Sequence, residues 1–389
     1  MGEIPLESRV ALASLLGVVE GSRTRFMSSK DSGTLLSRQL HFMSFLKTMK
    51  LGDNVALTGF TTLTRNAIMA CYVANLAAGN TLLCKSIKSG TISKYLSAAA
   101  DLSKPAQMMN PTIDIMGKQS QLITDLIHEC KRWESMPNRR EPVTKDMVNY
   151  LIDKGASKHS DNHVAATADW LILGLQAGFR KAEWAQDRTH VNKHGTFKRN
   201  IDGSSSAFIK SDFEFRGHKG KRLDHTKPIL IDEVSTVRLT WRYQKNQDNG
   251  QVIPFAKDTL DPKFCSVAAA LRIWHRSERF SVPLDHPIAV FVAIKGKKKT
   301  KSLTYIDDIH ISTLLRAAAK SVHNITSTKE LARFTAHSLR VGACVIMHTN
   351  GSSTSMIQVR LRWKSDAFKF YLRNVESLAE HHRDVLRKA

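Results

Sequence analysis

Two residues that could act on a phosphate group lie where the chain is expected to turn. Arg180 follows an apolar stretch that ends at Gly178, a residue suited to a helix C-cap, and Glu183 is near enough to orient the guanidinium. Lys245 lies in the polar segment Arg242–Asn246, from which a flexible amine can swing into a phosphate site. Taken alone, a surface arginine and a solvated turn lysine are the commoner interpretations.

His337 and Arg340 form a His-x-x-Arg pair further along the chain. A spacing of three places both side chains on one face of a helical turn. Both can then donate hydrogen bonds to the same phosphoryl group. The pattern occurs often by chance, so it is weak evidence alone.

Tyr371 lies in the last cluster, inside a helix that is expected to begin at Asp366, and Trp363 precedes it. Cations crowd this segment: Arg360, Arg362, Lys364, Lys369 and Arg373. We therefore expect the Tyr371 phenol to ionise more readily than an ordinary tyrosine. The alternative is a helix whose aromatic side chains are simply buried.

The composition favours a folded protein that binds a polyanion. Of the 389 residues, 42% are hydrophobic, enough for a sizeable core. With a net charge of +23, the positive side chains would repel one another unless a polyanion such as nucleic acid bound to the surface. The alternative interpretation is a soluble basic protein that binds no polyanion. The scattered cysteines, Cys71, Cys84, Cys130, Cys265 and Cys344, indicate reduced thiols. We expect no secretory signal, and we interpret the uncharged stretch Asn66–Cys84 as a buried helix and its turn.

The elements that must position these residues fall into two regions. Residues 1–33 are expected to be a partly ordered lead-in, and residues 34–133 a helical domain. Its predicted helices are Leu35–Met49, Phe60–Ala78, Thr91–Leu102 and Gln119–Trp133. The last could be capped near Asp114 or Ser120. Two prolines make residues 134–143 a linker.

Residues 144–374 mix helices with a few strands, and residues 375–389 form a tail. Thr144 is expected to cap the first helix. The predicted helices are Asp146–Lys154, Ala165–Phe179, Cys265–Ser277, Ile309–Val322 and Arg340–Thr349. The predicted strands are Ser206–Glu214, Val234–Tyr243, Val252–Phe255 and Ile288–Ile294. Asn249-Gly250 between two of them predicts a hairpin with Lys245 near its tip.

In the order Arg, Lys, His-x-x-Arg, Trp and Tyr, residues 140–380 resemble the catalytic domain of tyrosine recombinases, the phage-integrase family. The amino-acid sequence around Trp363 is similar to that of recombinases from eukaryotic mobile elements of the crypton-like and DIRS-like kinds. Two departures stand out. Leu361 replaces a usual glycine of that branch, and Tyr371 follows Trp363 by eight residues, one fewer than in many members.

The resemblance implies a mixed α+β fold, with an N-terminal helical core-binding (SAM-like) domain followed by a mostly helical catalytic domain with a small antiparallel sheet. In such an enzyme Arg180 and Arg340 would bind the non-bridging phosphate oxygens. Tyr371 would attack the phosphate, giving a 3′-phosphotyrosyl link and a free 5′-hydroxyl. Because the covalent link keeps the bond energy, rejoining would need neither metal nor ATP.

The remaining roles are also carried over from the resemblance. Lys245 would be the general acid for the leaving 5′-oxygen, and His337 would assist proton transfer and position the phosphate. Trp363 would hydrogen-bond the phosphate or pack. Glu183 would orient Arg180 or His337.

The expected partner is double-stranded DNA, bound by a homotetramer on two DNA sites, with no membrane and no small-molecule substrate. The tail would dock on a neighbouring subunit. The cations expected on DNA are Lys297, Lys298, Lys299, Arg362 and Lys364, although the lysine run could equally be a nuclear-targeting signal or a solvated loop. The protein would be nuclear in a eukaryote and otherwise cytoplasmic and DNA-associated. A type IB topoisomerase and a catalytically inactive DNA-binding descendant are the rival interpretations.

Overall fold

The computed structural model describes residues 29–80, 86–103, 110–135, 139–157, 162–200, 202–244, 248–295, 300–372 and 387. Two compact units divide the chain: an N-terminal unit, Met1–Pro137, and a C-terminal unit, Asn138–Ala389. The predicted lead-in up to residue 28 and almost all of the predicted tail lie outside the described residues.

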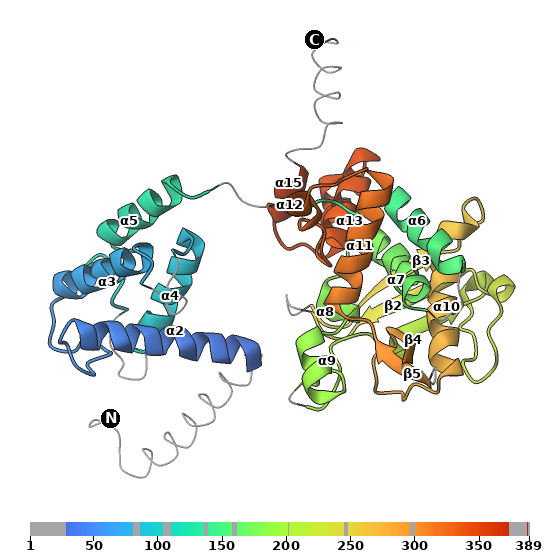
Figure 1. Ribbon diagram of the computed structural model, residues 1–389, viewed down its shortest axis with the longest axis horizontal. Helices are drawn as coiled ribbons and strands as arrows, with labels where there is room; N and C mark the ends of the chain where they lie inside the picture. Colours follow the sequence, from blue (N-terminus) through green and yellow to red (C-terminus); the bar gives the residue numbers. More distant parts are fainter. Residues whose placement is uncertain are drawn as a thin grey trace. The chain divides into compact units, whose positions relative to one another are not determined.

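The N-terminal unit is helical in its described part (Figure 1). Its helices are α2 (Ser29–Thr48), α3 (Thr62–Ala77), α4 (Ser89–Asp101) and α5 (Gln121–Arg132). They match the four predicted helices to within a few residues, apart from the start of α2. Phe42, Tyr72 and Leu96 meet in the core, and burying such a side chain contributes about 1.5–3 kcal/mol. The apolar part of the stretch after Arg65 is therefore a core helix, as predicted.

The structure decides which of the two predicted residues caps α5. Ser120 is the N-cap residue, and Asp114 instead accepts hydrogen bonds from the backbone of Met116 and Lys118 in the preceding turn. None of the helices in the described segments of either unit is long and apolar enough to cross a membrane.

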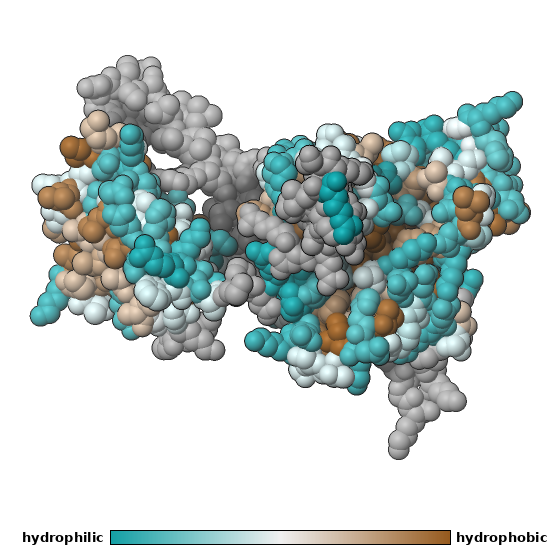
Figure 2. Space-filling model, turned by 90° about the horizontal axis from the view of Figure 1, so that it is seen from above, coloured by the Kyte–Doolittle hydropathy of each residue, from teal (hydrophilic) through white to brown (hydrophobic). Residues whose placement is uncertain are grey.

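The C-terminal unit is built around α7 (His163–Ala177), whose buried residues lie on every face. Its other helices are α6 (Lys145–Ala156), α8 (Lys181–Trp184), α9 (Arg188–His194), α10 (Ser266–Arg279), α11 (Asp308–Val322), α12 (Thr328–Leu331), α13 (Ser338–Thr349), α14 (Thr354–Leu361) and α15 (Lys369–Leu372). Thr144 caps α6 as predicted, its side chain accepting from the Met147 N–H. α6, α10 and α13 all pack on α7, so the central helix fixes where α13 begins. The face of this unit seen in Figure 2 is mostly hydrophilic, with scattered hydrophobic side chains.

Two small antiparallel sheets complete this unit. One contains β1 (Phe213–Arg216), β2 (Thr236–Trp241) and β3 (Gln251–Ala256), and the other contains β4 (Val290–Lys295) and β5 (Thr300–Tyr305). β2 and β3 form the predicted hairpin, closed by Gly250 at φ 84°, whose N–H donates to the Trp241 carbonyl at 2.8 Å. The architecture is therefore the predicted one, a mostly helical α+β chain with small antiparallel sheets.

One predicted strand is largely wrong. Residues 206–212 do not form the strand predicted from Ser206, because their polar groups are used locally. The Ala207 carbonyl and the Asp212 carboxylate both accept from the Arg242 guanidinium, at 2.9 and 2.6 Å, and Asp212 also accepts from the Ile209 N–H. A 3-10 turn, Lys210–Asp212, occupies the segment, and β1 begins only at Phe213.

Candidate active site

The end of α7 brings the first arginine into position. Gly178 adopts the left-handed conformation (φ 57°) that ends the helix, as its type predicts. The chain then turns so that Arg180 becomes the N-cap of the short helix α8. A β-carbon at Gly178 would lie 2.9 Å from the Leu361 side chain, so α7 and α14 are in close contact here.

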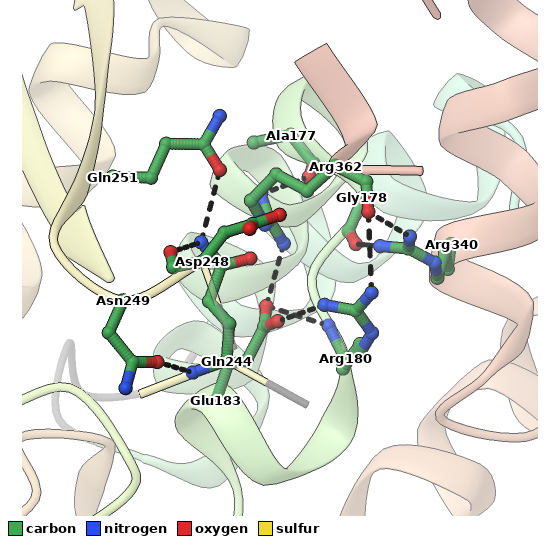
Figure 3. A network of polar contacts seen from close by, with 10 residues as sticks. All are labelled: Ala177, Gly178, Arg180, Glu183, Gln244, Asp248, Asn249, Gln251, Arg340 and Arg362. Carbon is green, nitrogen blue, oxygen red and sulfur yellow. Dashed lines mark hydrogen bonds and ion pairs between the residues drawn. The ribbon is translucent and has the colours of Figure 1, made fainter. Parts of the chain in front are cut away.

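Glu183 ties this turn together from α8 (Figure 3). Glu183 is 5% exposed, and its carboxylate accepts from the Arg180 backbone N–H at 2.9 Å and from the Arg180 Nη1 at 3.0 Å. It also accepts from the Arg362 Nη2 at 2.8 Å. The described contacts thus have Glu183 orienting two arginines, whereas they include no hydrogen bond from Glu183 to His337.

Arg340 reaches the same place from α13. Arg340 is 2% exposed, and its Nη1 donates to the Gly178 carbonyl at 2.6 Å. The guanidinium also lies over the Trp363 ring, 4.3 Å from its centre. Burial and the nearby charges of Arg180 and Arg362 lower the pKa of Arg340 to about 9.

We call Arg180, Arg340, Arg362 and Glu183 the arginine cluster. Among the described residues, Glu183 is the one carboxylate that forms an ion pair within this cluster, and it pairs with Arg180 and Arg362. The cluster therefore carries an excess of positive charge, which suits an anion carrying several oxygens.

His337 and Tyr371 lie beside the cluster, and we call them the nucleophile pair after the role predicted for Tyr371. His337 is the residue before α13, and its Nε2 lies 2.9 Å from the Tyr371 hydroxyl. Tyr371 lies in α15, which packs on α13 and is anchored by the buried Phe368 and Leu372. The expected helix after Asp366 is thus formed by a 3-10 turn followed by α15. A tyrosine and a histidine far apart in sequence are in hydrogen-bond contact within one chain.

The electrostatics of this pair differ from the prediction for Tyr371. Burial raises the pKa of the Tyr371 phenol, and the charge of Arg340 opposes that rise without reversing it. The expectation of an unusually acidic phenol was wrong, because the half-buried ring loses more from desolvation than it gains from the cation. Desolvation and the charges of Arg340, Arg140 and Arg180 lower the pKa of His337. A neutral imidazole next to a protonated phenol is suited to accept the phenolic proton.

Trp363 packs between the two groups. Its ring contacts Tyr371 at a centroid distance of 5.7 Å, in addition to Arg340. Its indole Nε1 is buried and has no hydrogen-bond partner among the described residues. Leu361, which stands where related recombinases usually have a glycine, is fully buried in the small hydrophobic cluster against which Trp363 packs. The leucine side chain therefore fills the core at this turn.

One predicted DNA-binding residue is placed elsewhere. The Arg362 side chain is 0% exposed, since Ala177, Glu183 and the Trp241 ring surround its guanidinium. It cannot lie on a DNA-binding surface, and sequence reasoning missed its contacts with the arginine cluster. A cation flanked by Leu361 and Trp363 at a helix end was the available signal.

Lys364 is well exposed, with a 2.9 Å ion pair to Asp248. Lys245 and the lysines at 297, 298 and 299 lie outside the described residues. The described residues on either side of Lys245 are joined to each other: the Gln244 N–H donates to the Asn249 side chain at 2.7 Å, and the Gln244 side-chain amide donates to the Gln251 side chain at 3.0 Å (Figure 3).

Comparison with known proteins gives structural similarities alone. No protein-family model matches the chain, and no curated protein matches its sequence. Among solved structures, it is similar to a lambda integrase dimer bound to a COC′ core site, with 13% identity, a TM-score of 0.44, and 92% of this chain and 94% of that chain covered. It is also similar to the XerH site-specific recombinase bound to difH, at 11% identity and a TM-score of 0.44 over 89% and 77% of the two chains. A third similar structure is that of the XerA recombinase, with 14% identity and a TM-score of 0.35, and 98% of this chain and 99% of that chain are covered. Because these TM-scores and identities are low, function must be inferred from the side chains of the site.

Proposed function

We propose that the protein is a tyrosine recombinase that cuts and rejoins DNA through a 3′-phosphotyrosyl intermediate, for integration or excision of a mobile element. The observation that carries the proposal is the 2.9 Å contact between the Tyr371 hydroxyl and His337 Nε2, beside a cluster of three guanidinium groups. A nucleophile, a proton acceptor and donors for an anion are thereby held together.

The reaction follows from these groups. The Tyr371 oxygen attacks the phosphorus, a new oxygen–phosphorus bond forms, and the bond to the 5′-oxygen breaks. His337 takes the phenolic proton, and Lys245 gives a proton to the leaving 5′-oxygen. Arg180 and Arg340 stabilise the charge that develops on the non-bridging oxygens, each such donor contributing about 2.7–4 kcal/mol. Rejoining reverses these steps with a 5′-hydroxyl as the nucleophile.

The Trp363 indole suits a further contact with the phosphate. Its unpartnered Nε1–H is next to Arg340 and Tyr371. An indole donates but cannot accept a proton, so it would bind the phosphate without taking part in proton transfer.

Duplex DNA is the proposed substrate, because the net charge of +23 favours a polyanionic partner. Lys364 and the lysines at 297, 298 and 299 would contact backbone phosphates. A homotetramer on two DNA sites, and nuclear location in a eukaryotic host, belong to this proposal.

The test is covalent trapping. A nicked suicide duplex, from a library of candidate DNA ends, should give a protein–DNA adduct that survives denaturing gel electrophoresis and maps to Tyr371. Tyr371→Phe should lose the adduct while its DNA affinity stays within about twofold of the unmutated protein, since only the nucleophile is removed. Absence of an adduct across the library would contradict the proposal. Efficient relaxation of plasmid lacking recombination sites would instead indicate a topoisomerase.

A further inference from the structure

Arg362 adopts a backbone conformation that is unusual for arginine. It ends α14 in the left-handed region, at φ 57°. Helices commonly end this way on glycine, which has no β-carbon to clash. An arginine that is held there, with its side chain entirely buried, indicates that the surrounding contacts fix both its backbone and its side chain.

The backbone carbonyl of Arg362 is shared by the two proposed phosphate-binding arginines. Arg180 Nη2 lies 3.4 Å from this oxygen, and Arg340 Nη2 lies 3.5 Å from it. Arg180 follows α7 and Arg340 lies in α13, so one carbonyl oxygen contacts two guanidinium groups from separate parts of the chain. The contacts are long, which suits donors that must also turn towards a ligand.

The side chain of Arg362 acts on the same arginines through Glu183. Its Nη2 donates to Glu183 Oε2 at 2.8 Å, and Glu183 in turn accepts from the Arg180 backbone and guanidinium. Its Nη1 donates to the Ala177 carbonyl at 2.9 Å, at the end of α7. Figure 3 shows these bonds of Arg362, Glu183 and Arg180, with Arg340 beside them.

We propose that Arg362 is a positioning residue for strand cleavage: its carbonyl and its guanidinium together set the orientation of Arg180 and Arg340. This inference rests on the proposed function. Because Arg362 is buried, its loss should change the geometry of the phosphate-binding groups and leave the DNA-binding surface intact. The effect should therefore be on the rate of the chemical step and not on DNA affinity.

Arg360 provides a matched control on the same helix. Its Nε donates to the Gln176 carbonyl at 2.9 Å, its Nη1 donates to the Pro254 carbonyl at 2.8 Å, and it lies over the Phe255 ring. It thus resembles Arg362 in joining carbonyl groups of other elements and in stacking on an aromatic ring, yet its described contacts do not include Glu183, Arg180 or Arg340. A general packing role would make the two arginines equivalent.

The first measurement compares Arg362→Lys with Arg360→Lys on a nicked suicide duplex at saturating protein. We expect Arg362→Lys to lower the single-turnover cleavage rate about 10- to 100-fold, with the dissociation constant for DNA within about twofold. Arg362→Gly, which suits the left-handed turn but lacks the guanidinium, should show a similar loss of rate. Arg360→Lys should cleave within about twofold of the unmutated protein. Equal rates in the two lysine variants would overturn the proposal, as would a loss that appears only in DNA affinity.

The second measurement needs no catalysis. Phenylglyoxal modifies accessible arginines, and mass spectrometry of the full chain can follow Arg180, whose side chain is 25% exposed. If Arg362 restrains Arg180, modification at Arg180 should be several-fold faster in Arg362→Lys and unchanged in Arg360→Lys, with circular dichroism showing that both variants are folded. Unchanged modification in both would overturn the positioning role even if cleavage were never observed. Faster modification without any adduct from the unmutated protein would retain that role and contradict the recombinase proposal.

Discussion

The two halves of the candidate active site are built differently. In the arginine cluster Glu183, Arg340 and Arg362 are buried and Arg180 is partly exposed, and backbone carbonyls of Ala177, Gly178 and Arg362 fix the guanidinium groups. The nucleophile pair lies at the edge: His337 is exposed, and Tyr371 belongs to a helix of four residues. The proposed phosphate site is therefore preorganised by the core, whereas the proposed nucleophile is held by a small local element that less energy would displace.

The largest expected effect tests whether the arginine cluster belongs to the core. Glu183→Ala would leave the fully buried Arg362 guanidinium without its counter-charge, so we expect the free energy of unfolding to fall by about 3–5 kcal/mol. His337→Ala, on the exposed side of the site, should change it by about 0.5 kcal/mol or less. Chemical denaturation followed by circular dichroism measures both. Similar values for the two variants would remove the contrast between the halves.

A smaller effect is expected when the charge in the cluster is kept and its shape is changed. In Arg340→Lys, the ammonium group lacks the planar fork that reaches Gly178 and a ligand together. We expect single-turnover cleavage to fall about 10²- to 10³-fold, which corresponds to about 2.7–4 kcal/mol of transition-state stabilisation. DNA affinity measured by fluorescence anisotropy should change little by comparison. A loss of affinity equal to the loss of rate would show that Arg340 binds DNA without favouring the transition state.

The smallest effect concerns the nucleophile pair and pH. The pKa of His337 is lowered, so the imidazole stays neutral, and able to accept a proton, to a lower pH than an ordinary histidine does. The cleavage rate should therefore stay constant as pH falls through the usual histidine range, and then drop about tenfold per pH unit below the lowered pKa. Single-turnover rates of the unmutated protein and His337→Gln, measured across acid pH, test this. The variant should lack that acid limb; if it keeps the same limb, another group is titrating.

Sequence periodicity predicted most long helices and the hairpin, because those depend on local alternation and on caps such as Thr144 and Gly178. It failed at Ser206–Asp212, where Arg242 from another segment takes up the polar groups. The burial of Arg362 could not be predicted from the sequence either. Residue type shows a cation, but the Ala177 carbonyl that receives it lies 185 positions away. β5 was not predicted, since its first two residues, Thr300 and Lys301, belong to a lysine-rich run that is typical of a loop.

The close approach of Gly178 and Leu361 has a consequence for how such chains diversify. A methyl group at residue 178 would lie 2.9 Å from the end of the Leu361 side chain, which would have to shift, and the left-handed backbone at residue 178 itself favours glycine. A bulkier residue at position 178 would therefore be accommodated more easily beside a smaller residue at position 361. Homologues that keep this active site should therefore carry correlated changes at these two positions, and chains that break the correlation should have rebuilt the turn before the tryptophan.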